Sequence, residues 1–137
     1  MRRAGMIAVL VLQGCAANDI HHVRPLRPLE LATAPYQQSS AATVAGSLMY
    51  EGGCLLFRPD GPAERLLPIW PVGSIFNGTS LIFHQPGKAD QPILIAQQLV
   101  MTGRRVAWRE LSSAAYAPFE HQCGAQPFLV SEVRPAD

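Results

Sequence analysis

Charged side chains are scarce in this chain, and their scarcity limits the partners it can bind. Asp, Glu, Lys and Arg make up 15% of its 137 residues, below the roughly 25% that is typical of soluble domains. The formal net charge is +1. Arg2 and Arg3 lie in a segment that we expect to be cleaved off, which leaves nine basic against ten acidic side chains. No basic surface remains for nucleic acid, and we expect no nucleic-acid partner.

The chain also lacks an apolar run long enough to cross a bilayer as a helix, which takes about 20 residues. Its N-terminus has instead the layout of a secretion signal. Met1-Arg2-Arg3 is positively charged, the apolar run Met6–Leu12 comes next, and Gln13-Gly14-Cys15 follows. The alternatives are an ordinary signal peptide cut nearby, or a buried N-terminal helix. The helix is disfavoured because no amphipathic pattern continues after this run.

Leu12-Gln13-Gly14-Cys15 resembles the bacterial lipobox, in which a leucine and a small residue before a cysteine direct its lipidation and cleavage ahead of it. Three of the four residues match the motif, and Gln13 is an uncommon choice at the variable position. The resemblance implies a signal peptide over residues 1–14 and a lipid anchor on Cys15, through which the protein would partner a membrane. Two or more acyl chains hold a protein stably at a bilayer.

The resemblance also implies where the protein resides. In many Gram-negative bacteria the residue after the lipidated cysteine sorts lipoproteins between the two membranes. Ala16 takes that position here, and it is not the aspartate associated with retention in the inner membrane. We therefore expect a cell-envelope protein, anchored in the outer membrane and facing the periplasm.

Residues 15–42 show no apolar periodicity and contain three prolines and the small polar run Gln37–Ala42. This composition predicts a lipidated N-terminus followed by a flexible tether, which would hold a domain roughly 25–30 Å from the bilayer. His21-His22 with Asp19 could bind a metal loosely. A tight site needs three or four ligands fixed by further contacts, so we expect no metal here.

Cysteine is sparse, with three residues in the chain. If Cys15 carries the lipid, Cys54 and Cys123 remain as a pair in an oxidising compartment. We expect them to form a disulfide, which would close a loop of about 70 residues and stabilise the domain by roughly 4 kcal/mol in the chain-entropy treatment. Two separate buried thiols are the alternative.

From residue 43 to residue 137 the chain has room for one domain, which begins with three short β-prone runs. Val44–Tyr50, Cys54–Phe57 and Leu66–Trp70 are separated by glycine- and proline-containing turns. Pro68 and Pro71 cannot donate ladder hydrogen bonds, so we expect the third run to lie at a sheet edge or to be bulged.

The second half of the domain is more ambiguous. Asn77-Gly78, between two apolar runs, predicts a tight hairpin. Pro92–Met101 fits a helix or strands, and we prefer strands followed by a hairpin at Gly103-Arg104. We expect Leu111–Ala117 to form a short helix that ends at Pro118, with Cys123 in a loop after it, and the last strand at Phe128–Val133.

Five to seven short strands with one short helix predict an all-β domain, a small closed barrel. A first strand bent at Gly46, a long hairpin and a closing C-terminal strand resemble an OB-fold over about residues 43–133. Gly53-Cys54-Leu55, Leu67–Pro71 and Cys123 also resemble a pattern in small bacterial lipoproteins and secreted proteins, which mostly have no assigned activity. The resemblance therefore implies a scaffold and a compartment without a function.

The sequence contains no motif that by itself indicates catalysis. Ser112-Ser113, His84 and His121 supply a nucleophile and bases, but no Gly-x-Ser-x-Gly elbow accompanies them. His121 and Cys123 lack a second pair of ligands, so we expect no metal and no cofactor. The enzyme alternative is a small hydrolase in which His84 or His121 meets a carboxylate in a cleft, such as Glu110, Glu120 or Glu132.

The candidate binding surface consists of aromatic and basic residues. Trp70 would form a ligand platform or, more often for such a residue, cap the core, and an apolar patch around Trp70 or Trp108 would favour a binding module. Arg104 and Arg105, with Arg109, predict a solvated hairpin tip or a patch for lipid head groups or an acidic glycan. We therefore expect a non-catalytic binding or scaffolding module, whose partner is an envelope polymer, an envelope protein or a small ligand.

Overall fold

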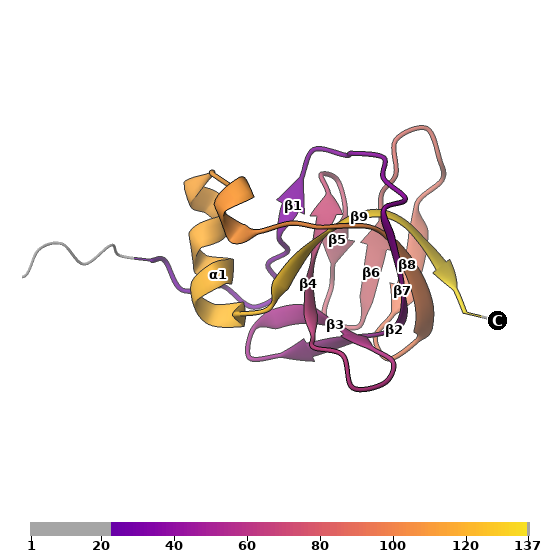
Figure 1. Cartoon of the computed structure of the whole chain (residues 1–137), viewed down its shortest axis with the longest axis horizontal. Coiled ribbons are helices and arrows are strands. Elements are labelled where there is room, and N and C mark those ends of the chain that lie inside the picture. Colours follow the sequence, from indigo (N-terminus) through magenta and orange to yellow (C-terminus); the bar gives the residue numbers. More distant parts are fainter. Residues whose placement is uncertain (1–22, 137) are drawn as a thin grey trace, which may run out of the picture.

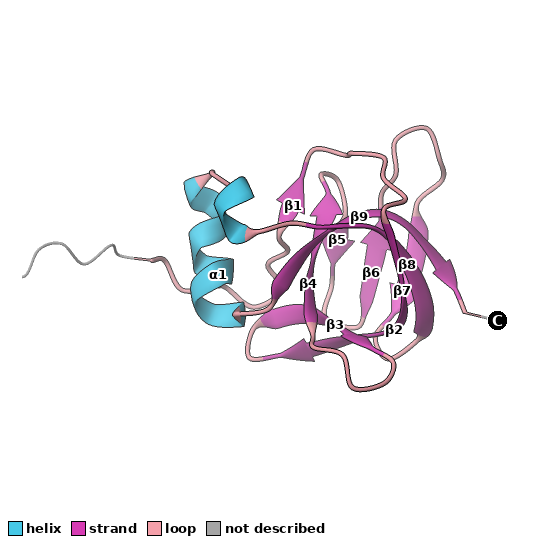
Figure 2. Ribbon diagram, viewed as in Figure 1, coloured by secondary structure: helices cyan, strands magenta, loops and turns pink. Residues whose placement is uncertain are grey.

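The structure is a computed structural model that describes residues 23–136, whose regular secondary structure is mostly β-strand (Figure 2). The strands are β1 Thr33–Ala34, β2 Ala42–Glu51, β3 Cys54–Pro59, β4 Leu66–Pro71, β5 Ile75–Phe76, β6 Ser80–Phe83, β7 Gln91–Leu94, β8 Gln98–Arg105 and β9 Gln126–Pro135. Between β8 and β9 lie two short 3-10 helices, η1 Trp108–Glu110 and η2 Ala114–Tyr116, and one α-helix, α1 Ala117–Cys123. The predicted signal peptide, Cys15 and His21-His22 lie outside the described residues. No helix within residues 23–136 is long and apolar enough to cross a membrane.

Five strands form a ring-like sheet (Figure 1). β2 pairs antiparallel with both β3 and β8, and β3 pairs antiparallel with β4. Because β8 returns beside β2, the strands β8-β2-β3-β4 have the spatial order of a Greek key. β9 is antiparallel to β8 and parallel to β4, and its pairing with β4 closes the ring. The mostly β class with one short α-helix is confirmed.

The ring closes tightly at two glycines within strands. The first half of β2 pairs with β8 and its second half with β3, and Gly46 belongs to both ladders. A Cβ atom on Gly46 would overlap the carbonyl oxygen of Arg58 on β3. Gly103 lies at the register shift between β8 and β9, where a Cβ would overlap the carbonyl oxygen of Leu129. Both positions need glycine because the backbone of a neighbouring strand comes close there. Neither glycine is required by a turn.

Two apolar clusters lie on opposite sides of the ring wall. Side chains of a strand alternate between its faces. Leu55 and Phe57 therefore belong to the cluster inside the ring, the inner cluster, and Cys54 and Leu56 to the cluster outside it, the outer cluster. The inner cluster takes residues from all five ring strands and from the small sheet β5-β6-β7. The outer cluster covers β3, β4 and β9, where Phe119 of α1 packs against it. The chain thus fills the ring and covers part of its outer wall with its own helix.

The expected edge position of the proline-containing strand is wrong, because β4 lies between β1 and β9 and is buried along its whole length. The backbone N–H of Trp70 donates to the carbonyl oxygen of Ala32, just before β1, and that of Val72 donates to Ala34 of β1. The nitrogen of Pro68 faces the same side, at a position that β1 does not reach. The nitrogen of Pro71 faces the side of β9, but the pairing between β4 and β9 ends at Ile69, two residues earlier. Each proline therefore lies where no ladder partner is present.

The loop at Asn77-Gly78 connects β5 and β6 as predicted, but it holds three residues. Gly78 has a φ of 102°, and Asn77 does not have a positive φ. The side chain of Asn77 accepts hydrogen bonds from the backbone N–H groups of Thr79 (3.0 Å) and Ser80 (2.9 Å) instead. The side-chain bonds of an Asx turn therefore stabilise this hairpin.

Pro92–Met101 lies in β7, β8 and the loop between them, so the preference for strands is confirmed. The expected hairpin at Gly103-Arg104 is wrong, because β8 continues through it to Arg105. Gly103 adapts the strand to β9 rather than reversing the chain. Arg104 and Arg105 are consequently strand residues and not a hairpin tip.

The α-helix lies later in the sequence than the expected range Leu111–Ala117, because α1 begins at Ala117. Pro118 does not end a helix at Ala117; it lies in the first turn of α1, where the N–H that proline lacks would have no partner. α1 ends at Cys123, which is a helical residue, and Gly124 follows with a left-handed φ of 60°. Cys123 is bonded to Cys54 at the start of β3, so the predicted disulfide is confirmed and joins α1 to the ring.

Part of the stretch that the sequence assigns to a tether packs on the ring. Thr33 and Ala34 form β1, whose register places them opposite Trp70 and Pro71 of β4. Ala32 is buried, and its carbonyl oxygen accepts the N–H of Trp70 at 2.9 Å. Residues that pack on the ring are therefore already present before residue 43.

Candidate functional site

The two tryptophans of the predicted binding surface lie on different sides of the ring wall. Trp70 is 1% exposed in the inner cluster, where its ring packs edge-on against Phe83 with centroids 6.0 Å apart. It caps the core and cannot form a ligand platform. Trp108 begins η1 and packs, half-buried, against the outer cluster. The structure therefore does not bring the two side chains together.

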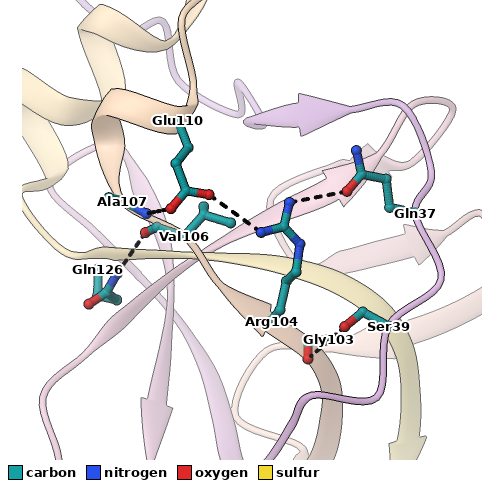
Figure 3. Close-up of polar contacts among 8 residues, drawn as sticks. All are labelled: Gln37, Ser39, Gly103, Arg104, Val106, Ala107, Glu110 and Gln126. Carbon is teal, nitrogen blue, oxygen red and sulfur yellow. Dashed lines mark hydrogen bonds and ion pairs between the residues drawn. The ribbon is translucent and has the colours of Figure 1, made fainter.

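Arg104 and Arg105 end β8, and their side chains differ in surroundings because neighbouring strand residues point to opposite faces. Arg105 is exposed, whereas Arg104 lies between two other segments of the chain (Figure 3). Its Nη2 donates to Oε1 of Gln37, 3.2 Å away, and its Nη1 to Oε2 of Glu110 on η1, 3.4 Å away. Arg104 thus bridges the chain after β1 and the connection between β8 and β9.

A cleft of about 230 Å³ opens beside Arg104. One wall is the chain just after β1, and the other is the connection that holds η1 and η2. Apolar side chains and hydroxyl groups share the cleft, which is lined by Ala34, Pro35, Gln37, Arg104, Val106, Glu110, Leu111, Ser112, Ser113, Tyr116 and Leu129. This arrangement suits a small ligand that has an apolar part and one anionic group.

The charged pair in the cleft is partly open to solvent. Oε1 of Glu110 accepts the backbone N–H of Ala107 at 3.3 Å, which fixes the carboxylate over the start of η1. The side chain of Arg104 is 38% exposed. A guanidinium has five N–H donors, and the two bonds to Gln37 and Glu110 leave others for a ligand. A second carboxylate can therefore be bound by Arg104, beside Glu110 or in its place.

Tyr116 ties one wall of the cleft, the connection that holds η1 and η2, to β1. Its hydroxyl donates to the carbonyl oxygen of Thr33 at 2.8 Å. Burial raises the pKa of Tyr116 above its ordinary value, so the phenol stays neutral at physiological pH. Ser113 caps η2 by accepting the N–H of Ala115 at 3.3 Å. These bonds hold the η1–η2 connection against the ring and keep the cleft open.

The histidines of the enzyme alternative lie away from this cleft. Nδ1 of His84 contacts Oδ1 of Asp90 at 2.8 Å, in a partly exposed pair over Gly73. His121 is exposed on α1. Neither histidine shares a described cavity with the candidate carboxylates Glu110, Glu120 or Glu132. Residues 23–136 bring no three His, Cys, Asp or Glu side chains together as a metal site.

The sequence points to Arg104 as a candidate surface residue but gives no sign of its hydrogen-bond partner Gln37. Gln37 lies 67 residues away, in a stretch whose composition indicates a tether. Glu110 was a candidate only as a catalytic carboxylate, although its position three residues after Ala107 is the one from which a glutamate reaches back to a helix start. That spacing could have predicted its structural role.

No family model, no curated protein and no solved structure matches the chain. A proposal of its function therefore depends on the geometry of the cleft, together with the sequence features of the N-terminus.

Proposed function

We propose that the protein is a lipid-anchored cell-envelope protein that binds, without catalysis, an anionic group of an envelope polymer in the cleft beside Arg104. The lipobox-like residues Leu12–Cys15 support the anchor, and Ala16 supports the outer membrane facing the periplasm. The observation that carries the binding proposal is the cleft itself, in which a partly exposed guanidinium lies between walls of mixed apolar and hydroxyl-bearing side chains. A guanidinium binds carboxylates through paired hydrogen bonds, which gives both affinity and orientation.

The order of the strands supports an OB-fold-like barrel as the scaffold. Five strands close the ring, and four of them follow Greek-key order. OB-folds bind ligands on the face of their second and third strands, and with the loops that follow strands one and four. The corresponding elements here are β3, β4, the turn after β2 and the connection between β8 and β9.

The strand face of this scaffold is already occupied by the chain itself. Leu56 of β3 and Leu67 and Ile69 of β4 are buried in the outer cluster, against which Phe119 of α1 packs. A ligand therefore has access to the loops rather than to the strands. The connection between β8 and β9 is one of those loops, and it forms a wall of the Arg104 cleft. The fold analogy and the cavity thus support the same site.

Titration with an oligosaccharide of uronic acids tests this proposal, and the neutral sugar of equal length serves as the control. We expect the acidic sugar to shift backbone amide resonances of residues 34–37 and 104–116. Arg104→Gln should weaken binding about tenfold or more, since it removes a charge-assisted contact. Arg105→Gln removes the same charge from the neighbouring residue and should leave the affinity nearly unchanged.

Two results would overturn the binding site. One is equal affinity for the neutral sugar, and the other is an equal loss of binding in Arg104→Gln and Arg105→Gln. The anchor needs a separate test, by mass and membrane fractionation of the wild type and of Cys15→Ser. We expect an acyl mass increment and membrane binding in the wild type alone. The hydrolase alternative has no comparable support, because the cavities found within residues 23–136 do not bring His84 or His121 together with a candidate glutamate.

A further inference from the structure

A turn near the start of the described chain holds a leucine outward in an unusual backbone conformation. The N–H of Glu30 donates to the carbonyl oxygen of Arg27 at 3.3 Å, with Pro28 and Leu29 between them. Leu29 has a φ of 70°, in the left-handed region where such a turn usually has glycine. Its side chain is 42% exposed. Its Cδ2 lies beside Gly78, but Leu29 belongs to neither apolar cluster. Strain of this kind at a side chain outside the core points to a role outside the fold.

Tyr50 extends the surface around this turn. Its hydroxyl accepts the backbone N–H of Leu29 at 3.3 Å, and its ring packs against Phe76 with centroids 5.4 Å apart. Tyr50 is 37% exposed at the end of β2, four residues before the cysteine that is bonded to α1. An exposed leucine beside a tyrosine, which has an apolar ring and a polar tip, is suited to a boundary between water and lipid.

The exposed charged side chains on the segment of this turn are basic. Arg24 and Arg27 are both exposed on the same segment. Two acidic residues lie nearby in the sequence. Glu30 accepts the backbone N–H of Arg27 at 3.1 Å, so its carboxylate is directed back into the turn, and Glu51, which follows Tyr50, pairs with Arg65 at 2.6 Å. Apolar side chains flanked by arginines match the surface of a bilayer that contains anionic lipids.

The path of the chain places this surface close to the proposed anchor. Val23, where the described chain begins, lines one groove with Glu30 and with Ala114 and Pro118, beside η2 and α1. This is the end of the long axis opposite to the C-terminus (Figure 1). Seven residues lie between Cys15 and Val23, and the eight residue-to-residue steps span at most about 29 Å when fully extended. Lipids on Cys15 would therefore keep the turn near the membrane.

We propose that Leu29 and Tyr50, with Arg24 and Arg27, rest on the anionic lipid surface of the membrane that holds the anchor. The contact orients the domain, with α1 toward the bilayer and the C-terminus away from it. This inference rests on the lipid anchor of the proposed function. It adds a second, non-covalent membrane contact and a defined orientation.

Depth-dependent quenching tests the orientation in the lipidated full chain, purified from membranes and placed in vesicles of phosphatidylethanolamine and phosphatidylglycerol. Leu29→Cys carries an environment-sensitive fluorophore; the native cysteines do not react, because one is lipidated and two are bonded to each other. Gln98→Cys is the control, since its carbonyl oxygen accepts the N–H of Ala136 at the far end. Head-group quenchers should reduce the fluorescence of the label at Leu29, because the label would lie at the level of the lipid head groups, and should leave the fluorescence of the control label unchanged.

The other outcomes identify which proposal fails. If the chain floats with the vesicles but the label at Leu29 is not quenched, the anchor stands and the membrane contact is refuted. If the chain does not float, the anchor fails and the contact fails with it. Equal quenching after Arg24→Gln and Arg27→Gln, or in vesicles of phosphatidylcholine alone, refutes the preference for anionic lipid. Energy transfer between labelled copies without quenching assigns the surface to a second copy and also refutes it.

Discussion

Removal of the disulfide between Cys54 and Cys123 should destabilise the whole domain, not α1 alone. α1 has seven residues, fewer than the roughly 12–15 below which an isolated helix is marginal in water. Phe119 is its one buried residue. The bond joins the last residue of α1 to the first residue of β3, so it crosses from the cover of the ring to the ring itself.

The magnitude follows from the length of chain that the bond closes. The two cysteines are 69 residues apart, for which the chain-entropy relation gives about 4 kcal/mol. Each kcal/mol lowers the melting temperature of a domain of this size by about 4–8 °C, so Cys54→Ala with Cys123→Ala should melt about 15–30 °C lower. A typical domain has about 5–15 kcal/mol of stability in total, so this loss is a large share.

Guanidinium unfolding with two probes separates a global from a local effect. In a Trp108→Phe background, the one remaining tryptophan is Trp70, which is buried inside the ring and reports on the ring. Far-ultraviolet circular dichroism reports on the whole chain. We expect both transitions to move together to lower denaturant in the double alanine variant and in the reduced wild type. A loss below about 1 kcal/mol, or an unchanged Trp70 transition, would refute the chain-entropy reasoning.

Two further predictions test the packing around the cleft. Gly103→Ala should lower the free energy of unfolding by about 3 kcal/mol or more, measured with denaturant. The new methyl group would overlap the backbone carbonyl of Leu129, and moving that carbonyl would disrupt the hydrogen-bonded ladder between β8 and β9. Tyr116 has a raised pKa in the folded state, so the folded chain keeps this proton to higher pH than the unfolded chain does. Its contribution to stability is therefore fully present below about pH 10, the ordinary pKa of tyrosine, and falls as the pH rises above it. Tyr116→Phe should remove that part of the alkaline loss, measured as urea midpoints at increasing pH.

Local turn chemistry made the first three strands of the ring predictable. The expected runs Val44–Tyr50, Cys54–Phe57 and Leu66–Trp70 lie within β2, β3 and β4. Glycine, proline and aspartate between these runs act on their own backbone, so their effect does not depend on the rest of the fold. The same holds for the hairpin at Asn77-Gly78, where the asparagine bonds the residues that follow it.

The errors all come from residues whose role depends on distant neighbours. Gly103 fits a turn equally well until β9 is placed beside it, some 25 residues later in the chain. Pro118 can end one helix or begin another, and only the position of the helix on the ring decides between them. Pro68 and Pro71 are compatible with an interior strand because β1 is short and the β9 ladder stops early. None of these conditions can be read from local sequence.

The candidate site shows the same limit. Arg104 stands out in the sequence as part of a basic pair, but its role depends on Gln37, 67 residues away, and on Glu110 across the cleft. Trp70 stands out equally and proves to be core. Both are conspicuous residue types between β-prone runs, and burial decides which of them can meet a ligand.

The disulfide links the proposed compartment to the proposed site. The connection from β8 to β9 carries one wall of the Arg104 cleft and ends in α1, whose last residue is Cys123. A bond that persists only in an oxidising compartment therefore holds the segment that shapes the cleft. In a reducing compartment the same segment would be held by Phe119, Tyr116 and the Arg104–Glu110 pair, all near the surface of the ring. The proposed binding site would therefore depend on a bond that an oxidising compartment preserves.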